Sequence, residues 1–394
     1  MLVLGLSSTV SPSPAYAAPE RIHPLNEGAS CPDVLIVAAS GASDSGADRD
    51  PLNEEERTVW GNWINNVTVP SGERFAERPE SIGWAYVPYP SSVGLGWEPF
   101  PTYQESVRAA LESTHRILDD TKASCGERTK FILVGYSIGG EIMHRVATQI
   151  GNRSPSGAAS TASGMTSVTA DDILGVALVA SPYRPAGSDS FGEAGPPGGG
   201  FMSSEPAQYG ALSDRVIHVC RRYDAACDAP RRIAILDLAL QVLGQMQFAL
   251  SDPGRTVSDF DAAIRGLVAN VVIDTVHNPQ WFDSDESYLD VLRRAADRTE
   301  NPEVPELTAE ELADAVRWAT GEGAPLVREK LRREGPRFIE DNRDVFDMIL
   351  QPYIFLGFVQ HMLYWNNNPT DQWYWESEKI VDWVAELAIE NGAR

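Results

Sequence analysis

Positive charge, cysteine and long apolar stretches are all scarce in this sequence. Lys and Arg total 32 against 56 Asp and Glu, which gives a formal net charge of −24 at pH 7. Such a surface repels nucleic acid and anionic headgroups, so we expect no nucleic-acid partner. No stretch beyond the first residues is apolar for long enough to span a bilayer. The four cysteines form no CxxC pair and no histidine cluster accompanies them, so we expect two disulfides and neither a metal nor another cofactor.

The first residues have the character of an export signal. Met1 to Leu6 is a short apolar run, and Ala15-Tyr16-Ala17 is a small-x-small cleavage site. The positive charge that usually opens a signal peptide is missing. We interpret residues 1–17 as a signal peptide remnant. The expected protein is secreted, monomeric, and located outside the cell or in the cell envelope.

Apolar runs that end in turn-forming residues predict the strands of a parallel sheet. Helical spacing of apolar residues predicts helices over 103–121 and 139–150. Because strands and helices alternate, we expect an α/β fold with a doubly wound, mainly parallel sheet. The expected strands are residues 34–39, 84–88, 131–134, 173–179 and 215–219.

From about residue 231 onward the strand signals fade and helix signals take over. The sequence Thr308-Ala309-Glu310-Glu311 is a capping box, which indicates the start of a helix. We therefore predict a core over residues 18–230 and a helical insertion or lid over residues 231–351. Residues 352–394 are expected to return to the core and to contribute its last helix.

The segment Gly135-Tyr136-Ser137-Ile138-Gly139 has the G-x-S-x-G pattern directly after an apolar strand and before a helix. A serine hydroxyl is a weak nucleophile unless it is exposed beside a base, and a sharp strand-to-helix turn exposes it. The flanking glycines permit the close backbone approach that such a turn needs. Ser137 is therefore the predicted nucleophile of a serine hydrolase.

An acid and a histidine must follow the serine, in that chain order. Asp224 follows the fifth expected strand and stands between Cys220 and Cys227. A disulfide between these two cysteines would pin the loop and hold the carboxylate toward an imidazole. Asp224 is the predicted acid.

These motifs together resemble the cutinase family of secreted serine esterases. That family has a G-Y-S-Q-G elbow and an acid within C-x3-D-x2-C, and it opens with a C-P-D strand like Cys31-Pro32-Asp33. Its Y-x-x-S before the central helix is matched by Tyr103-Gln104-Glu105-Ser106. The resemblance implies a carboxylic ester hydrolase with an α/β-hydrolase fold, and it implies that Cys31 pairs with Cys125.

The resemblance also bears on the base and on the oxyanion hole. His361 in His361-Met362-Leu363-Tyr364 fits the context of the family's histidine, and His277 is the alternative base. The family usually has Ser or Thr where Ala42 stands, so only the backbone N–H groups of Ala42 and Ile138 would form the oxyanion hole.

A helical segment stands between Asp224 and His361, where a plain cutinase has only a short loop. In this respect the chain is similar to mycolylarabinogalactan esterases of mycobacteriophages, and trehalose dimycolate hydrolases of mycobacteria are also cutinase-like. The resemblance implies a lipid or glycolipid ester as substrate, including mycolate esters of the cell envelope. Two alternatives stay open, an acyl transferase that uses the same triad and an inactive hydrolase fold that binds envelope lipid.

Overall fold

The computed structural model describes most of the chain from Cys31 onward. The described residues are 31–52, 63–78, 80–97, 100–153, 166–191, 193–202, 208–230, 233–277, 279–297, 307–345, 353–365 and 375–392. The predicted signal segment, and the predicted boundaries at residues 231 and 351, lie outside these ranges. They stay predictions.

Five parallel strands form the main sheet, in the order β2-β1-β4-β5-β6. Each apolar run became a strand because β-branched and other apolar side chains fill both faces of a sheet that is covered on both sides. Strand β4 lies in the centre, with Val34 of β1 opposite Lys130 of β4 and Phe131 of β4 opposite Ile173 of β5. The strands are β1 (Val34–Ala39), β2 (Ile82–Tyr86), β4 (Lys130–Tyr136), β5 (Ile173–Val179) and β6 (Val216–Val219).

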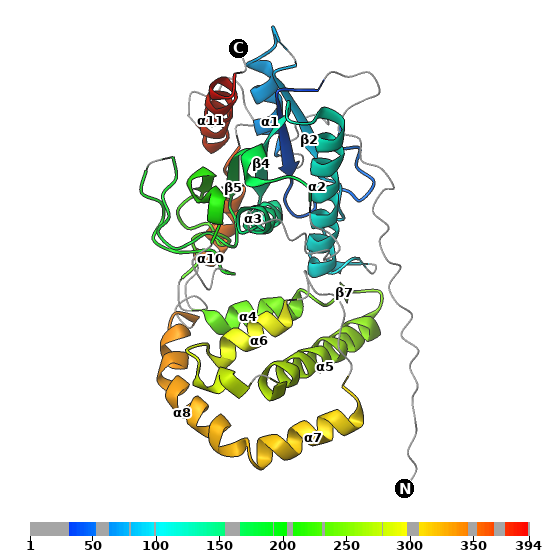
Figure 1. The fold of residues 1–394 in the computed structure, drawn as a ribbon, viewed down its shortest axis with the longest axis vertical. Helices are drawn as coiled ribbons and strands as arrows, with labels where there is room; N and C mark the ends of the chain where they lie inside the picture. Colours follow the sequence, from blue (N-terminus) through cyan, green and yellow to red (C-terminus); the bar gives the residue numbers. More distant parts are fainter. Residues whose placement is uncertain are drawn as a thin grey trace.

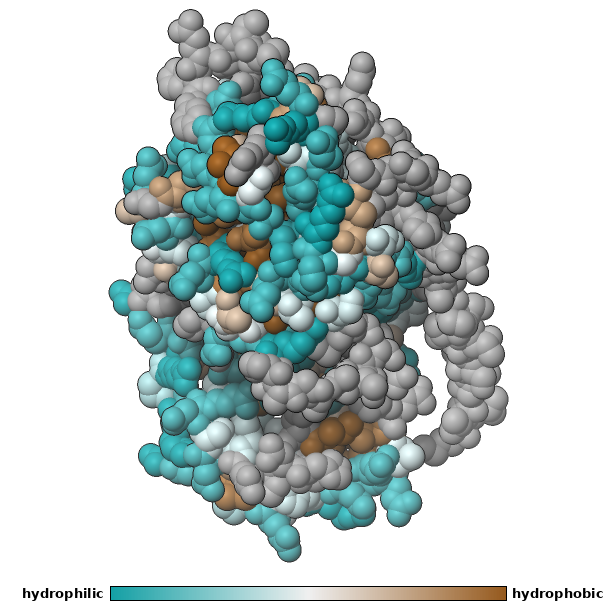
Figure 2. All heavy atoms as spheres, turned by 45° about the horizontal axis from the view of Figure 1, so that its top comes forward, coloured by the Kyte–Doolittle hydropathy of each residue, from teal (hydrophilic) through white to brown (hydrophobic). Residues whose placement is uncertain are grey.

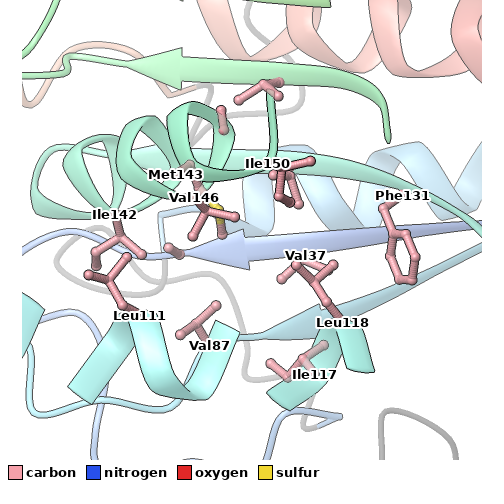
Figure 3. Packing of buried hydrophobic residues seen from close by; sticks show 14 of the residues in the cluster. Val37, Val87, Leu111, Ile117, Leu118, Phe131, Ile142, Met143, Val146 and Ile150 are labelled. Atoms are coloured by element: carbon pink, nitrogen blue, oxygen red, sulfur yellow. The ribbon is translucent and has the colours of Figure 1, made fainter. Parts of the chain in front are cut away.

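Helices cover both faces of this sheet, as a doubly wound fold requires (Figure 1). Helices α2 (Tyr103–Cys125) and α3 (Ile138–Gly151) pack on one face, and Figure 3 shows the apolar side chains between them and the strands. Helices α1 (Asn65–Glu73) and α11 (Glu376–Glu390) pack on the other face. Because side chains alternate between the two faces along a strand, Leu35 and Val37 of β1 belong to the apolar cluster under α2 and α3. The expected α/β fold with a mainly parallel sheet is confirmed.

The helical segment follows the sheet strands in the chain and lies beside the sheet domain (Figure 1). It joins that domain through a two-stranded parallel pair, in which β3 (Leu95–Gly96) pairs with β7 (Phe248–Ala249). The sequence did not predict these two strands, because two residues leave no periodic pattern. The helices are α4 (Ala234–Leu243), α5 (Pro253–His277), α6 (Tyr288–Ala296), α7 (Ala309–Thr320) and α8 (Ala324–Asp341), and after them comes α10 (Tyr353–His361).

Several local predictions can be compared directly with the structure. The capping box is present, since the side chain of Thr308 accepts a hydrogen bond from the backbone N–H of Glu311 at the start of α7. The second strand begins at Ile82, two residues before its expected start, and α2 continues to Cys125. Within the described ranges, short 3₁₀ helices span Ala170–Asp172, Gly210–Arg215 and Pro279–Asp283. Among the helices in the described ranges, none is both long and apolar enough for a membrane span.

Candidate active site

Ser137 lies in the sharp turn between β4 and α3. Its backbone torsions, φ 58° and ψ −119°, are unusual for a residue with a side chain. The turn can be this tight because Gly135 and Gly139 lack a Cβ, and an added Cβ at either would overlap backbone oxygen atoms. The Ser137 N–H donates to the Val179 carbonyl oxygen at 2.9 Å, which ties the turn to β5. This geometry matches the nucleophile elbow that the sequence predicts.

The structure brings the three predicted side chains together. His361 Nε2 lies 2.8 Å from Ser137 Oγ. On the other side of the ring, His361 Nδ1 lies 2.9 Å from Asp224 Oδ1 and 3.0 Å from Oδ2. His361 comes at the end of α10, so the long helical segment returns the chain to the sheet domain at this point. A serine, a base and an orienting acid thus have the mutual distances that acyl transfer needs.

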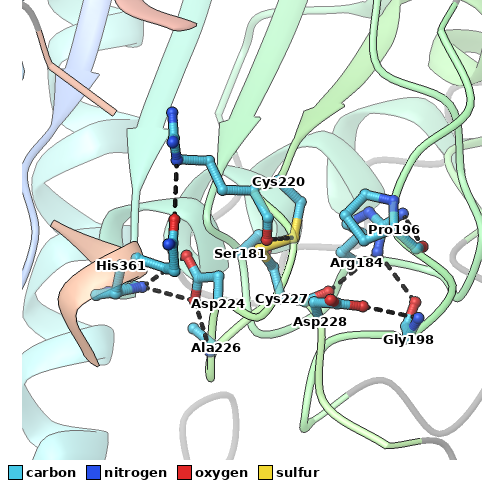
Figure 4. Close-up of a disulfide and its surroundings, with 12 residues drawn as sticks. Ser181, Arg184, Pro196, Gly198, Cys220, Asp224, Ala226, Cys227, Asp228 and His361 are labelled. Carbon is cyan, nitrogen blue, oxygen red and sulfur yellow. Dashed lines mark hydrogen bonds and ion pairs between the residues drawn. A yellow bond between two sulfur atoms is a disulfide. The ribbon is translucent and has the colours of Figure 1, made fainter. Parts of the chain in front are cut away.

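The loop that carries Asp224 is held in several ways. Cys220 and Cys227 form a disulfide that closes the loop, and Figure 4 shows Asp224 between this disulfide and His361. The Asp224 side chain is completely buried, and the Ala226 N–H donates to its Oδ1 at 2.7 Å. The second disulfide, implied by the family resemblance, joins Cys31 to Cys125. Both disulfides are as expected.

Two tyrosines complete the surroundings of the acid and the base. The Tyr364 hydroxyl donates to Asp224 Oδ2 at 2.6 Å. Tyr136 stacks against the His361 imidazole with ring centroids 5.3 Å apart, and its hydroxyl donates to the His361 carbonyl oxygen at 2.6 Å. Burial, together with the Asp224 charge, raises the pKa of both phenols well above their usual value, so both stay protonated donors. In the sequence these two tyrosines are only members of motifs, and no pattern there indicates their contacts.

The predicted oxyanion-hole residues are Ala42, in the loop after β1, and Ile138, directly after Ser137. Ile138 is the first residue of α3, where backbone N–H groups have no partner within the helix. Neither this N–H nor that of Ala42 donates to another group in the described part of the chain. The loop with Ala42 is fixed by its neighbours, because Ser43 N–H donates to the Ser91 oxygen at 2.8 Å and the Tyr89 hydroxyl donates to the Ser40 oxygen at 2.5 Å.

Other histidines have different surroundings. His277, the alternative base, ends helix α5, and its side chain lies outside the described residues. Burial lowers the pKa of His144 and of His218 to about 3, which keeps both rings neutral beside the Tyr209 hydroxyl. Within the described ranges, no three His, Cys, Asp or Glu side chains are grouped as metal ligands would be.

Parts of the chain are similar to known proteins. Residues 56–235 match the family model described as cutinase. The carboxylesterase Culp6 homolog of Corynebacterium glutamicum is 28% identical over 235 residues, which cover 54% of this chain and 71% of that protein.

Two solved structures are similar at low sequence identity. An acetylxylan esterase has a TM-score of 0.36 and 20% identity, over 59% of this chain and 99% of that one. A cutinase-like protein from Cryptococcus sp. has a TM-score of 0.34 and 15% identity, over 60% of this chain and 95% of that one.

The class of the protein is therefore a carboxylic ester hydrolase. Residues 56–235 match the cutinase family model and a carboxylesterase is 28% identical, as the resemblance predicted. Ser137 and Asp224 fall within the matched residues, whereas Ala42 and His361 fall outside them. The position of His361 beside Ser137 thus comes from the fold rather than from the family match.

Proposed function

We propose that this protein hydrolyses carboxylic esters of lipids, with Ser137 as nucleophile, His361 as general base and Asp224 as the orienting acid. The observation that carries this proposal is the 2.8 Å contact between His361 Nε2 and Ser137 Oγ, on an imidazole whose Nδ1 faces the buried Asp224. A serine nucleophile in acyl transfer is activated by an adjacent base that an acid orients, and these three side chains have that arrangement.

The proposed reaction has two halves. Ser137 Oγ attacks the ester carbonyl carbon while His361 Nε2 takes the hydroxyl proton, and Asp224 stabilises the resulting imidazolium. The tetrahedral intermediate collapses when His361 returns the proton to the alcohol oxygen, which leaves an acyl-enzyme. A water molecule then attacks the acyl carbon with His361 again as base, and the acid and free Ser137 are released.

Backbone donors at Ala42 and Ile138 would stabilise the oxyanion of both tetrahedral intermediates. Since residue 42 has no hydroxyl, the hole has two donors where the family usually has three. Removal of one such donor in other enzymes costs about 10²–10³-fold in kcat. We therefore expect slow turnover on small activated esters.

A lipid substrate is favoured by apolar side chains around the base. Helix α10 and the turn after it expose Leu356, Phe358, Val359 and Met362, with Phe358 72% exposed. Hydrophilic side chains predominate on the face shown in Figure 2, and apolar ones are exposed in small groups. Exposed apolar groups next to a reactive centre suit an acyl chain, and burial of each CH₂ contributes about 0.8 kcal/mol. Because the chain resembles cutinase-like esterases of mycolates, we propose mycolate esters of the cell envelope as the natural substrate class.

The place of action is part of the same proposal. Two disulfides suit an oxidising exterior, and the N-terminal sequence has the character of an export signal. We propose a secreted monomer that acts outside the cell or in the envelope. A helical segment over residues 231–351 is proposed to border the site.

The test is hydrolysis of p-nitrophenyl esters, from acetate to palmitate, by wild type and by Ser137→Ala. We expect kcat to fall about 10⁴-fold or more in Ser137→Ala, because the nucleophile is lost. The matched control is Ser113→Ala, which removes another buried serine hydroxyl, on α2 and outside the site. This control should keep wild-type turnover, and wild type should prefer the longer chains.

Different outcomes separate the alternatives. Turnover that survives in Ser137→Ala contradicts the proposal. A wild type that neither hydrolyses any ester nor reacts with a fluorophosphonate supports the inactive lipid-binding fold. Transfer of the acyl group to an added sugar in place of water, detected by mass spectrometry of the products, supports the transferase.

A further inference from the structure

The buried hydroxyl of Tyr364 connects the two segments that carry the acid and the base. It donates to Asp224 Oδ2 at 2.6 Å and accepts from the Arg221 N–H at 2.9 Å. Tyr364 stands three residues after His361, in a turn where the Met362 N–H donates to the Val359 oxygen at 3.1 Å. One side chain therefore fixes the loop of Asp224 against the chain segment of His361.

The carboxylate of Asp224 has few other partners. The Ala226 N–H binds Oδ1 at 2.7 Å, and His361 Nδ1 lies near both oxygens. Oδ2 is thus shared between the imidazole and the tyrosine hydroxyl. Since Asp224 and Tyr364 are both completely buried, water does not replace a missing donor without a rearrangement.

A donor at Oδ2 has two consequences for the histidine. It limits rotation of the carboxylate, which keeps Oδ1 and Oδ2 in the plane that His361 Nδ1 needs. It also spreads the negative charge of Asp224 onto the phenol, so that the carboxylate stabilises the imidazolium less strongly. The hydroxyl therefore acts on both the orientation and the basicity of His361.

From these contacts we propose that Tyr364 is a positioning residue for catalysis, which acts through Asp224 and touches neither substrate nor Ser137. The inference depends on the proposed function of Ser137, Asp224 and His361. Other titratable or charged groups near this cluster are Tyr136 from β4 and Asp44 from the loop after β1. Arg221 directs its guanidinium to Gln360 and Glu376.

The first variant is Tyr364→Phe, which keeps the ring in the core and removes only the hydroxyl. We expect kcat to fall about 10–100-fold with KM unchanged, because a hydrogen bond to a charged group is lost away from the substrate. The acidic limb of the kcat/KM pH profile should move to higher pH, because a carboxylate without the phenol donor stabilises the protonated imidazole more strongly.

The matched control is Tyr209→Phe, which removes another buried hydroxyl in the same domain. That hydroxyl lies 2.9 Å from His144 Nδ1 and has no contact with the proposed triad. The control should lose stability but keep the wild-type pH profile and kcat. If Tyr364 had only a structural role, both variants would behave alike. That result would overturn the inference.

A second substitution keeps the test informative if Tyr364→Phe does not fold. Incorporation of 3,5-difluorotyrosine at position 364 preserves the shape and makes the phenol a stronger donor. The acidic limb should then move to lower pH, opposite to the shift in Tyr364→Phe. An unmoved limb overturns the inference. If Ser137→Ala loses turnover while both proteins changed at position 364 keep wild-type kinetics, only the role of Tyr364 is rejected. The proposed function is then still supported.

Discussion

The sheet domain and the helical segment are stabilised in different ways. Strands β1, β4 and β5 are buried almost throughout, and two large apolar clusters lie on the two faces of the sheet. In the helical segment the apolar clusters are small, α7 buries only Ala315 and α8 only Lys330. Hydrophobic burial therefore stabilises the sheet domain, whereas the helical segment depends more on polar contacts.

Polar groups also join the two regions. Gln104 at the start of α2 donates through Nε2 to the carbonyl oxygens of Gln241 and Ala296, each at 3.0 Å. Arg145 of α3 binds Glu141 at 2.9 Å in its own helix and Asp297 after α6 at 2.7 Å. Buried polar contacts are directional, so they define one orientation of the helical segment on the domain that carries Ser137.

The largest effect on activity outside the proposed triad is expected where the sheet domain has no free space. In Gly139→Ala the new Cβ would overlap the backbone oxygens of Ala39 and Ser40, so the elbow must shift. Displacement of a nucleophile by about 1 Å can cost about 10²-fold, and we expect kcat/KM to fall by at least that much. The measurement is p-nitrophenyl ester hydrolysis with the folded variant.

A glycine in the helical segment is the control. At Gly254 near the start of α5 a Cβ would meet only Asp252 Oδ1 at 3.4 Å, so Gly254→Ala should be tolerated. It should gain about 0.5–1 kcal/mol of stability, since alanine loses less entropy in a helix. Equal losses of activity in both variants would contradict the contrast between the two regions.

The junction should respond strongly to loss of its buried cation. Arg145→Met removes the buried cation that binds Glu141 and Asp297, and we expect a loss of about 3–5 kcal/mol in the free energy of unfolding. Hydrogen exchange measured by segment should show faster exchange in α4 and α6 as well as in α3. The comparison variant is Arg293→Met, which breaks a pair with Asp237 inside the helical segment. If faster hydrogen exchange is confined to α6 in both variants, Arg145 does not join the two regions.

A smaller effect than the loss of Arg145 concerns the pH dependence of stability in the sheet domain. Burial lowers the pKa of His144 and of His218 to about 3, below the value near 6.5 of an unfolded histidine. Below pH 6.5 the unfolded chain therefore binds protons that the folded chain does not, so stability falls as the pH falls. The slope is about 1.4 kcal/mol per pH unit for each histidine.

Urea unfolding between pH 7 and pH 5 measures this slope. In His144→Phe one of the two buried imidazoles is absent, so the slope should decrease by one histidine's share. If wild type and variant lose stability in parallel, burial of His144 is not the cause of the acid sensitivity.

The sequence predicts an element well where that element depends on residues that are neighbours in the chain. Strands β1 and β5 were predicted to the residue, because a continuous apolar run followed by turn residues has few other uses in a parallel sheet. Helix α1 was missed, since Pro70 lies inside it and its apolar residues have no clear helical period. The β3–β7 pair was missed because its partners are far apart in the chain.

By itself, the sequence determined the sheet domain, the elbow around Ser137 and the cysteine-framed position of Asp224, because each depends on a short pattern of burial, turns or covalent spacing. Only the tertiary structure decided that His361 reaches Ser137, that Tyr364 donates to Asp224, and that Arg145 holds the helical segment. These contacts join residues separated by the whole helical segment, or by different layers of the fold. Local propensity carries no information about such distances, since chain packing alone sets them.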